Sequence, residues 1–120
     1  MDSILNTVKK MLNINAEDTF YDMDLTILIN GAIDRLKELG YQYDSEFVIT
    51  GDEETWDQFI GNDNRKNSII EYIYLKTRMG FNPPQGSSML ESCKSRLDEL
   101  EYILYVRENY TKPTGESQLP

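Results

Sequence analysis

The side chains that most often catalyse reactions or bind transition metals are scarce in this sequence. It contains no histidine, which is the commonest general base and the commonest ligand for such metals. Its one cysteine, Cys93, cannot by itself form a disulfide within the chain, a thiolate zinc site or a cysteine–histidine nucleophile. We expect Cys93 to be a small buried apolar residue, in a protein synthesised in a reducing compartment.

The carboxylates do not follow the spacing of a metal or catalytic site. Asp22 and Asp24 lie two positions apart in a predicted helix and therefore point to different faces. A calcium loop starting at Asp63 would lack its second ligand, because Arg65 stands there. No Gly-x-Gly or Gly-Lys-Ser/Thr stretch is present to bind phosphate. We therefore predict that the protein is not an enzyme and has no catalytic, cofactor-binding or metal-binding residues.

The formal charge of the chain is −9, and the imbalance is concentrated in one segment. From Glu38 to Asp63 there are eight acidic residues and no lysine or arginine. A protein that binds nucleic acid on its own needs the opposite sign of charge, so this role is excluded. The acidic segment is either a solvated surface that maintains solubility or a surface with a function in an assembly.

At 120 residues the chain is long enough for one domain with a modest core. It opens without a charged-then-apolar signal region, and no apolar run approaches the roughly 20 residues needed to span a bilayer. We expect a soluble protein with no membrane partner.

Apolar residues recur at three- and four-residue spacing, which predicts an all-α fold. The pattern indicates four main helices near 3–12, 22–39, 65–79 and 87–106, and a short helix near 53–60. Aromatic and β-branched residues at 41–50 favour an extended loop or a short strand there. The predicted fold is a small helical bundle in one domain, 1–106, followed by a flexible tail, 107–120.

Several residues are expected to begin, end or constrain these helices. Thr50 and Glu53 have the spacing of a capping box for the short helix, and residues 62–64 should cap the helix that follows. Glycine ends three of the helices, at positions 40, 61 and 80. Gly31 lies inside a helical pattern, which a close helix crossing would explain. The break after the fourth helix is the motif formed by Gly80, Phe81, Pro83 and Pro84.

The last helix carries a heptad seam and leads into the tail. Leucines and Cys93 alternate three- and four-residue steps, at Leu90, Cys93, Leu97, Leu100 and Leu104. We expect this seam to be buried against other helices. The tail lacks apolar periodicity but contains an aromatic residue beside two positive charges, Arg107, Tyr110 and Lys112. These three residues are predicted to dock on a partner.

The stretch EYIYLKTRMGFNPP at 71–84 resembles the head–tail connector (head-completion adaptor) proteins of tailed bacteriophages. The resemblance extends to the apolar spacing of 4–12 and 28–40 and to the sequence LDELE at 97–101, and covers roughly residues 3–106. One region departs from the family pattern. The acidic region 41–63 is larger than the link that the family usually has after its second helix.

The resemblance implies a structural virion protein that extends the DNA channel between the portal and the tail. Such proteins assemble as a ring, commonly of twelve copies, beneath the portal protein, and offer a docking surface to the next neck or tail-completion protein. DNA then passes through the channel without specific binding. The expected location is the neck of the virion, after synthesis in the host cytoplasm.

In such a ring the acidic segment should face the DNA channel, where like charge prevents DNA from sticking. The band is represented by Asp52, Glu53 and Glu54. The outer wall or a basic partner surface is the alternative position, whereas facing a neighbour's identical band would oppose ring closure. A second hypothesis for the whole protein is a small acidic adaptor or regulatory protein that acts as a monomer or dimer through its last helix.

Overall fold

The computed structural model describes residues 3–40 and 46–110, with side chains described as far as Tyr105. The described residues form five helices: α1 (Ile4–Met11), α2 (Asp22–Glu38), α3 (Trp56–Ile60), α4 (Lys66–Phe81) and α5 (Ser87–Tyr110). The described residues form no β-sheet, and only one isolated bridge joins Ser3 to Thr55. The predicted all-α fold is therefore confirmed, and the region 46–50 is an extended loop without a strand.

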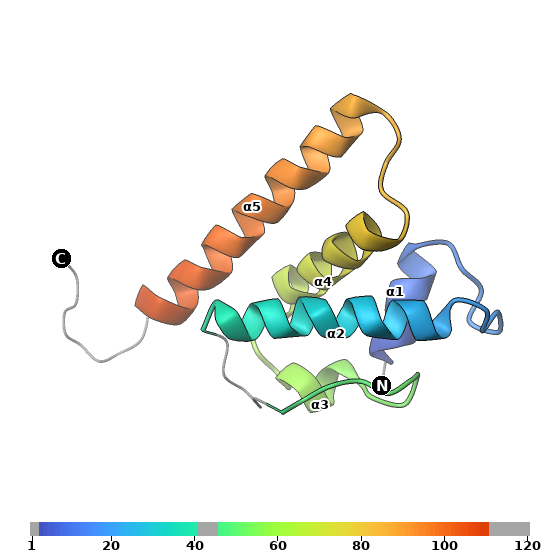
Figure 1. Ribbon diagram of the computed structural model, residues 1–120. Coiled ribbons are helices and arrows are strands. Elements are labelled where there is room, and N and C mark those ends of the chain that lie inside the picture. Colours follow the sequence, from blue (N-terminus) through green and yellow to red (C-terminus); the bar gives the residue numbers. More distant parts are fainter. Residues whose placement is uncertain (1–2, 41–45, 111–120) are drawn as a thin grey trace.

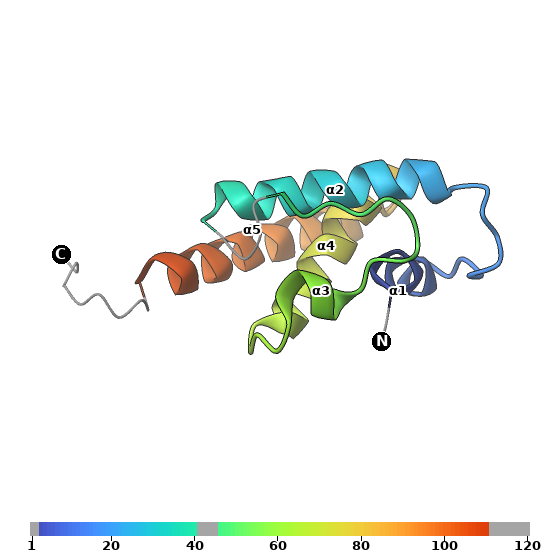
Figure 2. The ribbon, with the colours of Figure 1, turned by 90° about the horizontal axis from the view of Figure 1, so that it is seen from below.

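Helix α4 lies at the centre of the molecule and packs against α1, α2 and α5. Figure 1 shows α2 crossing in front of α4, and Figure 2 shows α2 on one side of the molecule with α1 and the short α3 on the other. The core is formed by apolar side chains from all five helices and the loop before α3: Ile4, Leu5, Val8, Leu25, Ile29, Ala32, Ile33, Leu36, Ile49, Trp56, Phe59, Ile60, Ile69, Tyr72, Ile73, Leu75, Leu100 and Leu104.

Side chains cap α1 and α3, but the residues that form the cap of α3 differ from those predicted. The Ser3 hydroxyl accepts a hydrogen bond from the backbone N–H of Asn6 and caps α1. The capping box of α3 was assigned to the wrong residues, because it is formed by Thr55 and Gln58. Thr50 instead donates its hydroxyl and backbone N–H to the carboxylate of Glu54, which closes the loop one turn earlier.

Helix α4 begins without a side-chain cap, so the predicted capping by residues 62–64 was wrong. Asp63 accepts hydrogen bonds from the backbone N–H and the guanidinium of Arg65 instead. The glycines at the ends of α2 and α3 behave as expected, since Gly40 and Gly61 have φ of 105° and 57°.

Gly80 does not end α4, which continues to Phe81 before the link 82–86 that contains Pro83 and Pro84. The structure gives Gly80 a different role, because a Cβ built on it would lie 2.7 Å from Cδ2 of Leu28. A close helix crossing was predicted at Gly31 instead, where nothing lies within 4 Å of such a Cβ. The prediction of a close crossing was therefore right in kind and wrong in position.

Asn30 explains how the extended loop is held on the helices. Its side-chain amide donates to the carbonyl of Ile49 at 2.9 Å, and its side-chain oxygen accepts from the N–H of Ile49 at 2.8 Å. The side chain of Ile49 is buried. A helical asparagine thus satisfies both backbone polar groups of a buried loop residue.

The seam of α5 is buried only in its second half. Leu100 and Leu104 belong to the core, whereas Leu90, Cys93 and Leu97 are half-buried. The expected full burial of Cys93 and Leu97 was therefore wrong. Figure 1 shows the reason, since the beginning of α5 extends past the end of α4. The helix also continues four residues beyond the predicted end at 106, to Tyr110.

The burial gradient along α5 predicts unequal effects of the same substitution. Leu100→Asp should lower the free energy of unfolding by about 4 kcal/mol, because it places a carboxylate in the core and removes apolar burial. Leu97→Asp should cost about 1–2 kcal/mol, because water reaches this position. Urea unfolding followed by circular dichroism measures both. Equal losses for the two variants would show that the whole seam is buried.

Candidate interaction surfaces

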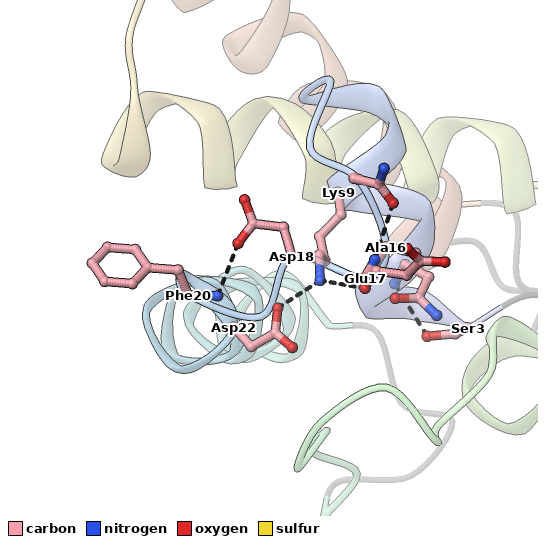
Figure 3. Close-up of polar contacts among 9 residues, drawn as sticks. Ser3, Lys9, Ala16, Glu17, Asp18, Phe20 and Asp22 are labelled. Carbon is pink, nitrogen blue, oxygen red and sulfur yellow. Dashed lines mark hydrogen bonds and ion pairs between the residues drawn. The ribbon is translucent and has the colours of Figure 1, made fainter.

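A buried ion pair fixes the turn between α1 and α2. The Lys9 side chain is 1 % exposed and that of Asp22 is 29 % exposed. The ammonium group of Lys9 lies 2.7 Å from Oδ1 of Asp22 and donates a second hydrogen bond to the carbonyl of Ala16 at 3.0 Å. Figure 3 shows that these contacts join the end of α1, the turn and the first residue of α2. A buried ammonium needs such partners, so the turn is held in one conformation.

Two further side chains shape this turn and present an aromatic residue to solvent. Asn15 accepts from the N–H of Glu17, and Asp18 accepts from the N–H of Phe20, each at 3.1 Å. Phe20 follows directly and is 81 % exposed. In Figure 3 its ring points away from the polar contacts. The position of Phe20 is therefore determined by the turn and not by burial.

Phe20 borders an open groove between the start of α2 and the end of α4, which we call the α2 groove. It is lined by Tyr21, Asp24, Ile27, Leu28, Gly80 and Phe81. The rings of Tyr21 and Phe81 meet edge to face with centroids 5.1 Å apart, and those of Phe20 and Tyr21 do so at 4.8 Å. Gly80 lets Leu28 lie against the backbone of α4 at the bottom of this groove.

The apolar residues around the α2 groove are unusually exposed. Met23 is 75 % exposed and Ile27 is 63 % exposed, in addition to Phe20. Single exposed apolar residues are common, but a cluster of large ones marks a surface that contacts another molecule. The sequence did contain a signal for this surface, because Met23 and Ile27 lie off the apolar stripe that runs from Leu25 to Leu36. We had not predicted this surface.

A second set of polar contacts attaches α5 to the bundle. Glu101 accepts hydrogen bonds from the hydroxyl of Tyr72 on α4 at 2.7 Å and from Arg35 on α2 at 3.0 Å. Further towards the start of α5, the guanidinium of Arg96 binds both carboxylate oxygens of Glu71 at 2.7 Å. Helices α2, α4 and α5 are thus joined at the carboxylate of Glu101. The bidentate pair of Arg96 and Glu71 sets the direction of the N-terminal half of α5, which extends beyond the core.

These contacts change the ionisation of the groups that form them. Partial burial raises the pKa of Glu101, but the hydrogen bonds from Arg35 and Tyr72 outweigh it, so the pKa of Glu101 is lowered. Hydrogen bonds from Arg96 lower the pKa of Glu71 against a smaller effect of burial. Burial and the bond to Glu101 raise the pKa of Tyr72 well above its usual value. All three shifts favour the ionised carboxylates and the neutral phenol.

The acidic segment is less negative in the structure than its sequence suggests. Within the described part of the segment, bases outside it pair with Glu38, Asp57 and Asp63, in the pairs Arg35–Glu38, Lys66–Asp57 and Arg65–Asp63. Glu54 accepts hydrogen bonds from Thr50, and these lower the pKa of Glu54 although burial opposes them. Of the three residues chosen for the band, Asp52 and Glu53 are exposed, whereas Glu54 holds the loop together.

The predicted docking residues of the tail lie at the edge of the described structure. Arg107 and Tyr110 belong to the last turns of α5, although their side chains are outside the described part, and Lys112 is outside it altogether. Their role stays a prediction. Of the break motif, Gly80 and Phe81 line the α2 groove.

Neither a metal site nor a membrane span is found in the part of the chain that the structure describes. Among these residues, no three histidine, cysteine, aspartate or glutamate side chains are grouped so as to hold a metal ion. None of the described helices combines the length and the apolarity needed to cross a membrane.

The fold and these surfaces define a helical protein built for docking. The family model described as phage connector protein matches residues 4–111, which is nearly the whole chain. The chain therefore belongs to the phage connector protein family, as its resemblance to head–tail connectors indicated. This family consists of structural proteins of the virion neck that contact other head or tail proteins, and it is not a family of enzymes. Comparisons with curated proteins and with solved structures found no match.

The buried ion pair at the start of α2 predicts a specific loss of stability. Asp22→Ala should lower the free energy of unfolding by about 3 kcal/mol, because it leaves the ammonium of Lys9 buried with one neutral partner. Asp24→Ala, two residues further along the same helix and exposed, is the matched control and should change it by less than about 0.5 kcal/mol. Thermal or urea unfolding would show the difference, and similar values for the two variants would contradict the assignment.

The attachment of α5 should be sensitive to acid. Because the folded pKa of Glu101 lies below the roughly 4.3 of an unfolded glutamate, its stabilisation is fully present above that pH. It is lost as the pH falls through the folded pKa. Glu101→Gln should therefore lower the melting temperature at pH 7 and flatten its fall between about pH 5 and 3. Glu91→Gln, at an exposed position of the same helix, should follow the parent curve.

Proposed function

We propose that the protein assembles as a ring, with twelve copies as the expected number, between the portal protein and the tail, and that this ring extends the DNA channel. The observation that carries the proposal is the match to the phage connector protein family over residues 4–111. The same position would bring the next neck or tail-completion protein onto the opposite face of the ring.

The distribution of exposed apolar residues supports a ring over a symmetric dimer. One group surrounds the α2 groove, and another lies on α5, where Met89, Tyr102 and Tyr105 are exposed. A two-fold dimer needs one self-complementary patch, whereas two different patches suit head-to-tail contacts that close into a ring. The negative net charge also suits a channel that DNA crosses without specific binding.

Within this ring we assign the channel-facing position to the loop that contains Asp52 and Glu53. Both side chains are exposed, and the loop is held on the body by Asn30 and by the bonds between Thr50 and Glu54. The alternative positions for this loop are the outer wall and a basic partner surface.

An adaptor that acts as a monomer or dimer through α5 is the second candidate function. It is favoured by the half-buried Leu90, Cys93 and Leu97 near the exposed Met89, which a partner helix could cover. Native mass spectrometry and negative-stain images of the protein, alone and with purified portal, separate the candidates. The ring predicts one closed species of high copy number, and a monomer or dimer under both conditions would overturn it.

Charge reversal tests the channel assignment. The double variant Asp52→Lys and Glu53→Lys should form rings but impair DNA retention or ejection in virions, because positive side chains would bind the passing phosphates. Glu54 is left unchanged, because its substitution would open the loop. Reversal of the exposed Glu91 and Asp98 on α5 is the control for the change in net charge. Failure of the loop variant to form rings while its monomer stays folded would place the loop in a subunit interface.

A further inference from the structure

We propose that the α2 groove of one copy binds the segment 107–112 of a second copy, with Tyr110 packing against the aromatic rings and the bases Arg107 and Lys112 facing the acids at the rim. This inference rests on the proposed ring, because it names the contact that would join neighbouring subunits. It assigns a function to the largest group of exposed apolar side chains in the described part of the molecule.

The shape and chemistry of the groove fit a tyrosine. Its walls include the rings of Tyr21 and Phe81, already arranged edge to face, and the side chain of Ile27. A third ring can add to such a pair in the same geometry. Tyrosine also brings a large contact area with few rotatable bonds, so little entropy is lost on binding.

The charges on the two sides are complementary. Asp24 lines the groove, and the exposed Glu17 and Asp18 precede Phe20 at its edge. The segment 107–112 reads RENYTK and carries two bases and one acid in a chain whose net charge is −9. The segment thus has a net positive charge and contains an aromatic residue, whereas the chain as a whole is negative. Opposite charges at the rim would orient the segment and speed its association.

The same chain cannot fill its own groove with Tyr110. Glu101 is bound to Arg35, close to the end of α2 at Glu38, whereas the groove lies at the start of α2. Figures 1 and 2 both show that α5 ends beyond the C-terminal end of α2, which is the end opposite the groove. With a rise of 1.5 Å per helical residue, Tyr110 lies on the order of 25 Å from Ile27. The groove and the segment can therefore meet only between copies, in a head-to-tail arrangement.

Cysteine crosslinking of the full-length protein tests this contact directly. In a Cys93→Ser background, Ile27→Cys and Tyr110→Cys are prepared as separate variants, one of them isotopically labelled, and mixed under mild oxidation. The expected product is the mixed disulfide dimer, and a chain that carries both cysteines should give a ladder of covalent oligomers. Tyr102→Cys, an exposed tyrosine on the same helix, is the matched control for Tyr110→Cys and should give about tenfold less crosslink with Ile27→Cys.

The outcomes separate this inference from the proposed ring. Rings without the mixed crosslink would overturn the groove contact and leave the ring in place. The mixed crosslink in open chains or dimers that never close would support the contact and contradict the ring. A preferred crosslink of Ile27→Cys with itself would show a two-fold contact at the groove and overturn the inference. If another protein occupies the groove, Tyr110→Cys would stay uncrosslinked, and this result would also overturn the inference.

Gly80→Ala provides a second test that does not depend on cysteines. The added Cβ would displace Leu28 from the bottom of the groove, while alanine favours the helix more than glycine does. The melting temperature should therefore be unchanged or higher, and the dissociation constant for self-association, from sedimentation equilibrium, should rise about tenfold. An unaltered dissociation constant in this variant and in Tyr110→Ala would overturn the inference.

Discussion

The carboxylate of Glu101 is the point at which the arrangement of the helices is decided. It accepts hydrogen bonds from Tyr72 of α4 and Arg35 of α2, so three helices meet at one group. Because the hydroxyl of the fully buried Tyr72 must have a partner, α5 can lie at one depth and one register against the other two helices. The exposed first half of α5 is a direct consequence, since the bidentate pair of Arg96 and Glu71 fixes its direction beyond the core.

A second constraint acts at the other end of α2, where the buried ammonium of Lys9 is bound to Asp22 and to the carbonyl of Ala16. This contact determines where α2 begins and therefore where Phe20 and Tyr21 lie. Gly80 completes the same region from α4 by allowing Leu28 to approach its backbone. The α2 groove is thus built by polar and steric constraints on residues that are themselves outside the core, which is typical of a surface kept for a partner.

The physical character of the molecule agrees with its family. A phage connector protein must present surfaces to other head or tail proteins. Here the helices supply a rigid core, large apolar residues are exposed at the start of α2 and along α5, and the net charge is negative. The charges of the acidic segment are in part structural, because Asp63 and Glu54 hold the backbone around α3. Asp52 and Glu53 are among its exposed acids and lie in the loop before α3.

The sequence by itself determined the fold class, the number of helices and most of their bounds. The reason is that helix formation depends on local spacing and on local breakers, such as Gly40, Gly61, Pro83 and Pro84. It also carried the family resemblance, which lies in the same apolar spacing. The sequence did not determine which threonine caps α3, because Thr50 and Thr55 both begin a capping pattern. Only the contacts of Glu54 and Gln58 distinguish the two.

Only the tertiary structure decided which residues meet. The sequence could not show that Gly80 and not Gly31 allows a close helix crossing, because this depends on the rotation of α2 relative to α4. It could not show that Leu97 is half-buried while Leu100 is in the core, because a heptad pattern does not say how far the neighbouring helix extends. The α2 groove and the pairing of Lys9 with Asp22 likewise join residues from different elements. Spacing along a chain specifies which face of a helix is apolar, but the partner of that face is fixed only when the helices pack.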